Sequence, residues 1–395
     1  MNLRNGFSMQ ERYWQNFCDI WKTRLGAGWL PPAGSSYPFA QVRRSLKGLV
    51  SRPPRPINGE PERYREEVSP LSPPPVGRVP TSWVAGPSLS SVSLILAGNT
   101  PLLSWSPLWA CLSAGVERIQ VKMSRDEMLW TPLFVEALRE VAPEMAERVE
   151  LHVWPGDDPR TDALLTQADA VIAYGSDKTM ATLRSRTPAG VPFYGFGHAV
   201  SVGLVLADAD IVAAARGFAV DMLMYGQAGC LSPHTVFVPD AETAFALAEA
   251  LLTVLPETAD ALDVPPVTDA AVARTVRQAR DMALFGGFTV RGTDDLRGTV
   301  AVTRTPQAMP EPVGYGFLHI VPLDVSPEQI GERLGQARGI VSGVGIAGTV
   351  TLTLRSALTQ EGVSYLCAPG AMQTPPIDWA NGGIDLREKL TFQSG

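Results

Sequence analysis

From residue 91 onward, short apolar runs alternate with longer amphipathic stretches, and this alternation limits the possible folds more than any other feature. A parallel strand that helices cover on both faces is buried along its whole length, so it shows as a short apolar run. The expected strands are residues 91–97, 118–123, 149–154 and 168–174, and the expected helices between them include 102–114 and 126–141. This order predicts an α/β fold with doubly wound parallel sheets.

A second series of α/β elements follows the first. Its expected helices are residues 208–225, 241–255 and 269–284, and its expected strands are 235–238, 299–303, 316–321 and 339–344. A chain of 395 residues is also too long for one compact core. We therefore expect two α/β domains, with their boundary close to Cys230.

The first 90 residues differ from the rest in composition. Prolines are frequent between residues 52 and 90, where little periodicity remains, so this stretch is expected to be extended. It separates an N-terminal arm from the main fold. In that arm Tyr13, Trp14, Phe17 and Trp21 recur at helical spacing, which predicts a helix that docks through its aromatic face.

Composition argues against several classes of function. The net charge of -7 and the lack of a Lys/Arg-rich block argue against nucleic-acid binding. The four cysteines are far apart and none has metal-ligand spacing, so neither a metal site nor a disulfide framework is expected. The N-terminus lacks a signal-peptide core and no apolar run is long enough to span a bilayer, so we expect a cytoplasmic location without a membrane span.

Cys230 is the first candidate for covalent chemistry. It lies in the stretch Gly229-Cys230-Leu231, where an apolar segment ends in small residues before a β-rich run. A thiol at such a turn can attack a carbonyl while its own backbone N–H faces the developing oxyanion. A free cysteine also commonly serves only to fill a core. The segment alone leaves both interpretations open.

The turn after the first strand, Gly98-Asn99-Thr100-Pro101, is the second candidate. The dinucleotide fingerprint GxGxxG is missing from this position. Asn99 stands between a strand end and an expected helix that starts with proline, where its side chain is suited to cap that helix. The same side-chain amide is suited to donate a hydrogen bond to an oxyanion.

These two candidates belong to an ordered series of motifs. Gly98-Asn99 is followed by Lys122-Met-Ser124, by Gly175-Ser176, by Asp208-Ala-Asp210 and by Gly226-Gln227-Ala-Gly-Cys230. In order and spacing the series resembles the aldehyde dehydrogenase superfamily.

The resemblance implies a role for each motif. It implies an oxyanion-binding Asn99, a ribose-contacting Lys122 with Ser124 in the same cofactor-binding segment, a turn at Gly175 and Ser176 over the pyrophosphate, and a nucleophilic Cys230. Without the resemblance, Lys122 would be a surface residue at a strand end. Ser176 would be an ordinary helix N-cap, which is compatible with phosphate binding at the same helix terminus.

A narrower resemblance extends to the C-terminus. Gly229-Cys230-Leu-Ser-Pro-His-Thr-Val and Met372-Gln-Thr-Pro-Pro-Ile-Asp-Trp379 are similar to the long-chain acyl-CoA reductase family of bacterial bioluminescence, a branch of the superfamily. The resemblance covers residues 90–390. After the tryptophan, where that family has His-His-Asp-Gly, this chain has Ala380-Asn-Gly-Gly383, so no role of those histidines is carried over.

One departure from the superfamily bears on the direction of the reaction. Oxidising aldehyde dehydrogenases have a glutamate upstream of the nucleophile that activates the hydrolytic water, whereas this stretch contains Tyr194-Gly-Phe-Gly-His198. An acyl-enzyme that must wait for hydride is better protected without that base, so the sequence favours reduction. His198 is a candidate proton donor to the departing thiol, and the alternative is a histidine that only belongs to a Gly-rich turn.

The resemblance therefore implies reduction of a fatty acyl thioester, carried by CoA or an acyl carrier protein, to the aldehyde. It implies NADPH as the cofactor, no metal, an acyl-transferring partner protein and a homo-oligomer. An alternative is an NAD(P)-dependent aldehyde or acyl-phosphate dehydrogenase. A non-catalytic protein that binds an acyl carrier or another subunit is the alternative from another class.

The same resemblance implies an aldehyde-dehydrogenase-like architecture with the active site between two domains. The expected segments are an N-terminal arm with the proline-rich stretch (1–90), an NAD(P)-binding Rossmann-like domain (91–225), a catalytic thiol domain (226–368) and a C-terminal segment (369–395). The last segment is expected to return to the cofactor domain or to join an oligomer interface.

Overall fold

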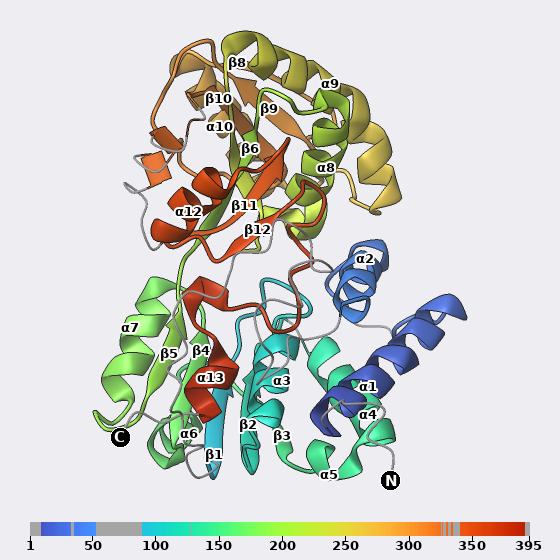
Figure 1. Ribbon diagram of the computed structural model, residues 1–395, viewed down its shortest axis with the longest axis vertical. Coiled ribbons are helices and arrows are strands. Elements are labelled where there is room, and N and C mark those ends of the chain that lie inside the picture. The colour runs from blue at the N-terminus through green and yellow to red at the C-terminus, as the bar shows by residue number, and fades with distance from the viewer. Residues whose placement is uncertain are drawn as a thin grey trace. The chain divides into compact units, whose positions relative to one another are not determined.

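The computed structural model describes residues 9–32, 35–52, 89–126, 128–324, 326, 329–330, 333–334 and 340–391. The proline-rich stretch predicted to be extended lies outside these ranges. The chain divides into two units (Figure 1). Unit 1 contains the described residues up to His198 and those from Pro376 onward, and unit 2 contains the described residues from Ala199 to Pro375.

Unit 1 is built on a parallel sheet with the strand order β3-β2-β1-β4-β5. Its strands are β1 (Ser91–Ile95), β2 (Arg118–Met123), β3 (Val149–Val153), β4 (Ala170–Tyr174) and β5 (Phe193–Phe196). Its helices between the strands are α3 (Trp105–Ser113), α4 (Trp130–Val141), α5 (Pro143–Ala146), α6 (Arg160–Gln167) and α7 (Asp177–Arg186). The strand order reverses between β1 and β4. In open α/β sheets, ligands bind at the carboxyl ends of the strands beside the point where the strand order reverses.

The N-terminal arm packs on unit 1. It consists of α1 (Met9–Gly26), which lies beside α4, and α2 (Phe39–Val50) (Figure 1). Trp14, Phe17 and Trp21 are buried, and their rings contact aromatic rings of α3 and α4. The predicted docking face is therefore confirmed for these three residues, while Tyr13 stays partly exposed. Burying each such side chain contributes about 2 kcal/mol relative to leaving it exposed.

Unit 2 contains a larger sheet with the order β12-β11-β6-β7-β10-β9-β8. Its strands are β6 (Val200–Val205), β7 (Pro233–Val238), β8 (Thr289–Gly292), β9 (Thr299–Val302), β10 (Phe317–Pro322), β11 (Val341–Ala347) and β12 (Tyr365–Cys367). Its helices are α8 (Ile211–Leu223), η2 (Met224–Gln227), α9 (Ala241–Ala261), α10 (Ala270–Phe285) and α12 (Leu352–Gln360). Among these strands only the β8–β9 pair is antiparallel, so the predicted doubly wound α/β class is confirmed.

The division between the units precedes β6. This strand pairs with β7 and β11 in the sheet of unit 2, and α8 packs against α9 in the same unit. The structure therefore divides after His198, whereas the sequence pattern predicted a boundary close to Cys230 and the resemblance implied one after residue 225. An apolar run does not show which sheet it will join, because its pairing partners are distant in the chain.

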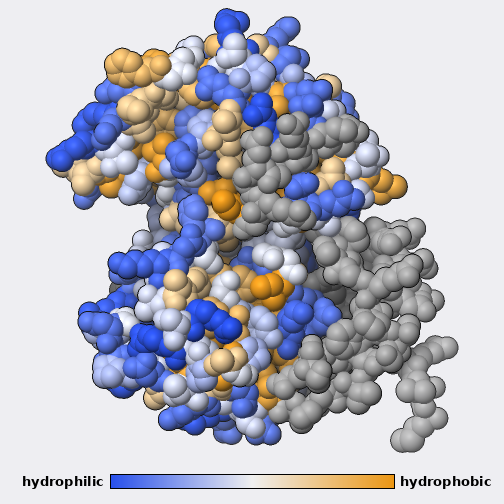
Figure 2. All heavy atoms as spheres, turned by 90° about the vertical axis from the view of Figure 1, so that its left-hand side faces the viewer, coloured by the Kyte–Doolittle hydropathy of each residue, from blue (hydrophilic) through white to orange (hydrophobic). Residues whose placement is uncertain are grey.

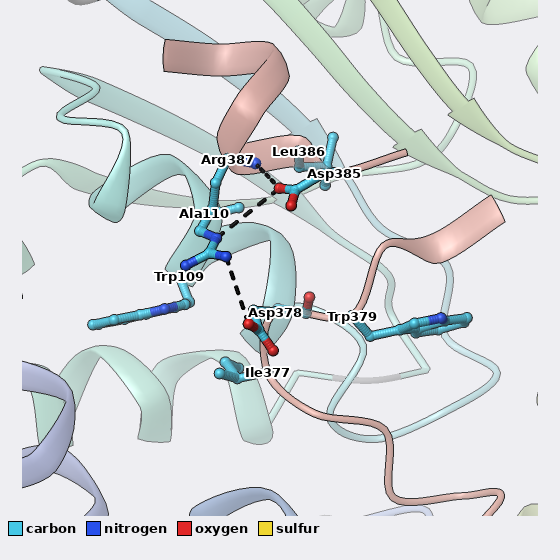
Figure 3. Close-up of a pocket in the computed structure, with 9 residues that line it drawn as sticks. Trp109, Ala110, Ile377, Asp378, Trp379, Asp385, Leu386 and Arg387 are labelled. Carbon is cyan, nitrogen blue, oxygen red and sulfur yellow. Dashed lines mark hydrogen bonds and ion pairs between the residues drawn. The ribbon is translucent and has the colours of Figure 1, made fainter. Parts of the chain in front are cut away.

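The last described segment packs in unit 1. It contains η3 (Asn381–Gly383) and α13 (Leu386–Thr391), and α13 lies against α3. In the small pocket between them, Arg387 points toward Asp378 and their side chains form an ion pair of 3.5 Å (Figure 3). Both side chains are almost fully buried, and Arg387 also lies 4.0 Å from Asp385, so removing Arg387 would take away the cation that compensates the buried Asp378 carboxylate.

The described surface on the face shown in Figure 2 is mainly polar. Hydrophilic side chains cover most of the described surface in Figure 2, and hydrophobic ones lie among them in small groups. Among the described residues, no helix combines the length and the apolar character needed to cross a bilayer.

Candidate active site

In unit 1, most of the predicted site residues gather at one edge of the sheet. Ile95 of β1 pairs with Lys122 of β2 and with Ala173 of β4, so the segments that follow these strands emerge side by side. The turn after β1 touches the segment after β2, because a Cβ added at Gly98 would lie 2.6 Å from Ser124 Oγ. Asn99, Ser124, Gly175 and Ser176 belong to these segments, and Lys122 lies at the end of β2 itself.

The capping interpretation of Asn99 is wrong. Helix α3 begins at Trp105, its N-cap is Ser104, and the residues between Asn99 and that cap form turns. These turns are closed by backbone bonds from Leu103 N–H to the Pro101 carbonyl and from Trp105 N–H to the Leu102 carbonyl. Asn99 is exposed at the carboxyl edge of the sheet, several residues before the helix it was expected to cap.

Lys122 brings positive charge to this edge. Its side chain is half-buried at the end of β2, and burial, together with the positive charge of Arg125, lowers the pKa of Lys122. Arg125 is exposed in the same segment. Arg125 was not among the predicted site residues, although it stands three residues after Lys122 in the sequence.

Two side chains at the start of α7 accept backbone hydrogen bonds. Ser176 caps the helix by accepting a hydrogen bond of 3.2 Å from the Thr179 N–H, which confirms the N-cap prediction. Asp177 accepts a hydrogen bond of 2.8 Å from the His198 N–H. His198 is exposed, and this bond fixes its backbone beside the helix start.

In unit 2, Cys230 follows a strained turn. The preceding residues Tyr225, Gly226 and Gln227 all have left-handed backbone angles, with φ of 55°, 59° and 64°. Non-glycine residues adopt this conformation only when their surroundings enforce it. The buried Gln227 side chain supplies that enforcement, because its amide donates to the Pro233 carbonyl at 2.6 Å and accepts from the Phe317 N–H at 2.9 Å.

The backbone of Cys230 is itself held in place. Its carbonyl accepts a hydrogen bond of 2.8 Å from Ser201 Oγ, and the same hydroxyl accepts one of 3.0 Å from the Gly343 N–H. Ser201 on β6 thus connects the thiol-bearing loop to β11. The Cys230 side chain is half-buried, and desolvation raises the pKa of its thiol to about 11.

The C-terminal motif is tied to the same loop within unit 2. Gln373 donates from its side-chain amide to Ser232 Oγ at 3.1 Å. The fully buried Asp221 of α8 accepts hydrogen bonds from the Gly370 and Met372 N–H groups at 2.5 and 3.1 Å. The most specific motif of the sequence therefore supports the segment that follows Cys230.

The structure thus shows two groups of candidate residues, one in each unit. Asn99, Lys122, Ser124, Gly175, Ser176 and His198 belong to unit 1, and Cys230 belongs to unit 2. Sequence reasoning missed Ser201, Asp221 and Asp177. A signal existed for the first two, because each is a polar residue inside an otherwise apolar strand or helix. Within the described ranges, His, Cys, Asp and Glu side chains form no cluster of three that could hold a metal ion.

Solved structures define the class of this fold. An NAD-dependent aldehyde dehydrogenase from Sinorhizobium meliloti superposes with a TM-score of 0.64 at 17% identity, over 91% of this chain and 73% of that one. An oxidoreductase from Marinobacter aquaeolei gives a TM-score of 0.69 at 15% identity, over 98% and 83% of the two chains. The fold is aldehyde-dehydrogenase-like, as the sequence predicted.

Sequence comparison identifies the family within that class. The family described as acyl-CoA reductase (LuxC) matches residues 82–391, and the chain belongs to this family. The long-chain acyl-protein thioester reductase of Aliivibrio fischeri is 27% identical over 221 residues, which are 53% of this chain and 44% of that relative. The protein of the same name from Vibrio harveyi is 27% identical over 149 residues, 36% and 31% of the two chains. Both matches span less than half of the relative's length.

Proposed function

We propose that this protein reduces a fatty acyl thioester to the aldehyde, with Cys230 as the residue that carries the acyl group. The observation that carries the proposal is the placement of Cys230: this partly buried residue lies three positions after a strained turn, and its carbonyl is held by Ser201. A buried structural cysteine needs neither of these features. Membership of the acyl-CoA reductase family and the names of the relatives support an acyl thioester, carried by CoA or by a protein, as the substrate.

In the first step, Cys230 Sγ bonds to the thioester carbonyl carbon, and the bond from that carbon to the carrier sulfur breaks. Nothing is oxidised or reduced, and the proton that Cys230 loses reaches the departing thiolate. His198 is the proposed carrier of this proton, because its exposed ring lies on a backbone fixed by Asp177. The Cys230 N–H and the Asn99 amide are the proposed donors to the oxyanion.

The carboxyl edge of the sheet in unit 1 fits a nicotinamide dinucleotide. The strand order reverses there, α7 presents its N-terminal amides, and Lys122 supplies a half-buried cation. Bound NADPH would supply the hydride that reduces the acyl group. We assign Lys122, Ser124, Gly175 and Ser176 to cofactor binding. Arg125, whose charge acts on Lys122, favours NADPH over NADH, because a second cation suits the additional phosphate of NADPH.

The proposal is tested by intact-mass analysis after incubation with a long-chain acyl-CoA. The wild-type protein is expected to gain one acyl group that is lost as aldehyde when NADPH is added. Cys230→Ser is expected to remain unlabelled, whereas Cys367→Ser, which changes a buried cysteine of the same unit, should label as the wild type does. Equal labelling of wild type and Cys230→Ser contradicts the proposal, and fast release of free fatty acid without NADPH favours a hydrolysing aldehyde dehydrogenase.

A further inference from the structure

The N-terminal arm makes direct hydrogen bonds to the edge of the sheet where the candidate residues of unit 1 lie. Tyr37, just before α2, donates from its hydroxyl to the Gly98 carbonyl at 2.6 Å. Its neighbour Ser36 donates from Oγ to the Asp126 carbonyl at 3.0 Å. Two adjacent residues of the arm thus hold the turn after β1 and the segment after β2.

These two segments also touch each other. Gly98 packs so closely on Ser124 that an added Cβ would lie 2.6 Å from the Ser124 Oγ and 3.0 Å from the Asp126 Cβ. The peptide that contains the Gly98 carbonyl leads directly into Asn99. A shift of this carbonyl therefore moves the backbone that carries the Asn99 side chain.

The arm itself is held firmly enough to act as a support. The aromatic residues of α1 pack into α3 and α4, and Arg24 forms a 2.6 Å ion pair with Glu140 of α4. Next to Tyr37, the Ser35 hydroxyl accepts from the Tyr37 N–H at 3.1 Å and donates to the Tyr37 carbonyl at 3.0 Å. The position of Tyr37 is thus fixed by local hydrogen bonds and by the docked helices.

We propose that Tyr37 is a positioning residue, through which the N-terminal arm holds the Gly98–Asn99 turn in the geometry that the reaction needs. Tyr37 lies outside residues 82–391, which match the family, so the family match itself assigns this residue no role. The expected effect of Tyr37 on kcat rests on the proposed function, because Tyr37 acts through Asn99 as an oxyanion donor.

The first test needs no activity. Amide hydrogen exchange is measured in peptides that cover residues 97–104 of wild type, Tyr37→Phe and Tyr13→Phe. Tyr13 is a matched control, because it lies on the same arm but its hydroxyl bonds to Glu144 of α5 rather than to the turn. We expect exchange about 10-fold faster only in Tyr37→Phe, since the variant loses one hydrogen bond and keeps the aromatic ring. Unchanged exchange in Tyr37→Phe overturns the proposal.

The second test is a double-mutant comparison of kinetics. Asn99→Ala is expected to lower kcat about 100-fold, and Tyr37→Phe about 10-fold with an unchanged KM for the acyl thioester. In the Asn99→Ala background, Tyr37→Phe should cause no further loss, because the two residues act through one group. Losses that multiply in the double variant overturn the positioning role. Wild-type kcat in Asn99→Ala instead contradicts the proposed role of Asn99, and the exchange experiment then decides on Tyr37 alone.

Discussion

Burial of the Cys230 thiol leads to a quantitative prediction about its reactivity. The surroundings raise the pKa of Cys230 to about 11, whereas an unperturbed cysteine has a pKa of about 8.5. At pH 7 the thiolate fraction is then about 0.01%, compared with about 3% for a free cysteine, which is a difference of about 300-fold. A thiolate of higher pKa is intrinsically more nucleophilic, and this recovers about 10-fold. The net expectation is alkylation about 30-fold slower than for a free cysteine.

The assay is the rate of iodoacetamide labelling from pH 6.5 to 10, followed by intact mass. Cys230→Ser provides the background from the other cysteines, of which Cys18 and Cys111 have a pKa of about 12 because they are buried. The slope of the logarithm of the labelling rate against pH separates thiol protonation from steric access to the sulfur. Steric shielding slows labelling equally at each pH and leaves this slope unchanged. We expect the rate to rise about 10-fold per pH unit up to pH 10. A plateau at or below pH 8.5 would show that burial does not control this thiol, and circular dichroism at each pH checks that the fold persists.

Two further variants test neighbouring contacts. Ser201→Ala leaves the Gly343 amide and the Cys230 carbonyl without their hydroxyl partner, so we expect a loss of about 1–3 kcal/mol in unfolding free energy and a lower kcat. Ser93→Ala is the control, because it removes a buried hydroxyl bonded to the Leu164 carbonyl in unit 1. In urea denaturation it should lose similar stability, but its kcat should stay unchanged. Equal losses of kcat in Ser201→Ala and Ser93→Ala contradict a specific role of Ser201. Arg125→Ala is expected to raise the KM for NADPH about 10-fold and to leave that for NADH unchanged. The control in steady-state kinetics is Arg139→Ala, which removes an exposed charge on α4. If Arg125→Ala raises the KM for NADPH and the KM for NADH alike, Arg125 does not recognise the additional phosphate.

The sequence predicted those features that depend on neighbouring residues. Buried strands such as β4 and β7 appear as apolar runs because both of their faces are covered, and the aromatic residues of α1 recur at the spacing of one helix face. Element ends were less predictable. The helix expected to start at Leu102 begins at Trp105, since turns occupy the residues after Pro101. Helix α9, expected to end before Pro256, continues through it to Ala261.

The environment of Cys230 could not be predicted from the residues next to it in the sequence. The groups that fix the loop around Cys230 come from Ser201 on β6, Gly343 on β11 and Gln373 near the C-terminus. Only the paired strands of unit 2 bring these residues to one place. The pKa of the thiol follows from the same packing, because desolvation is a property of everything around the sulfur. The sequence therefore indicated which residue to consider, and the fold determines how acidic its thiol is.

A thiol with a raised pKa is a slow nucleophile, but it has an advantage for a reductase. If Cys230 carries the acyl group, as we propose, the leaving group in any hydrolysis of that thioester is a thiolate of high basicity, which departs more slowly. The stretch that ends at His198 lacks the glutamate that would activate water. Burial and the missing base therefore act in the same direction, since both lengthen the life of the acyl-enzyme before reduction. The disadvantage is a slower acyl transfer, because a proton has to leave Cys230 in that step. A proton acceptor, the role proposed for His198, would accelerate it.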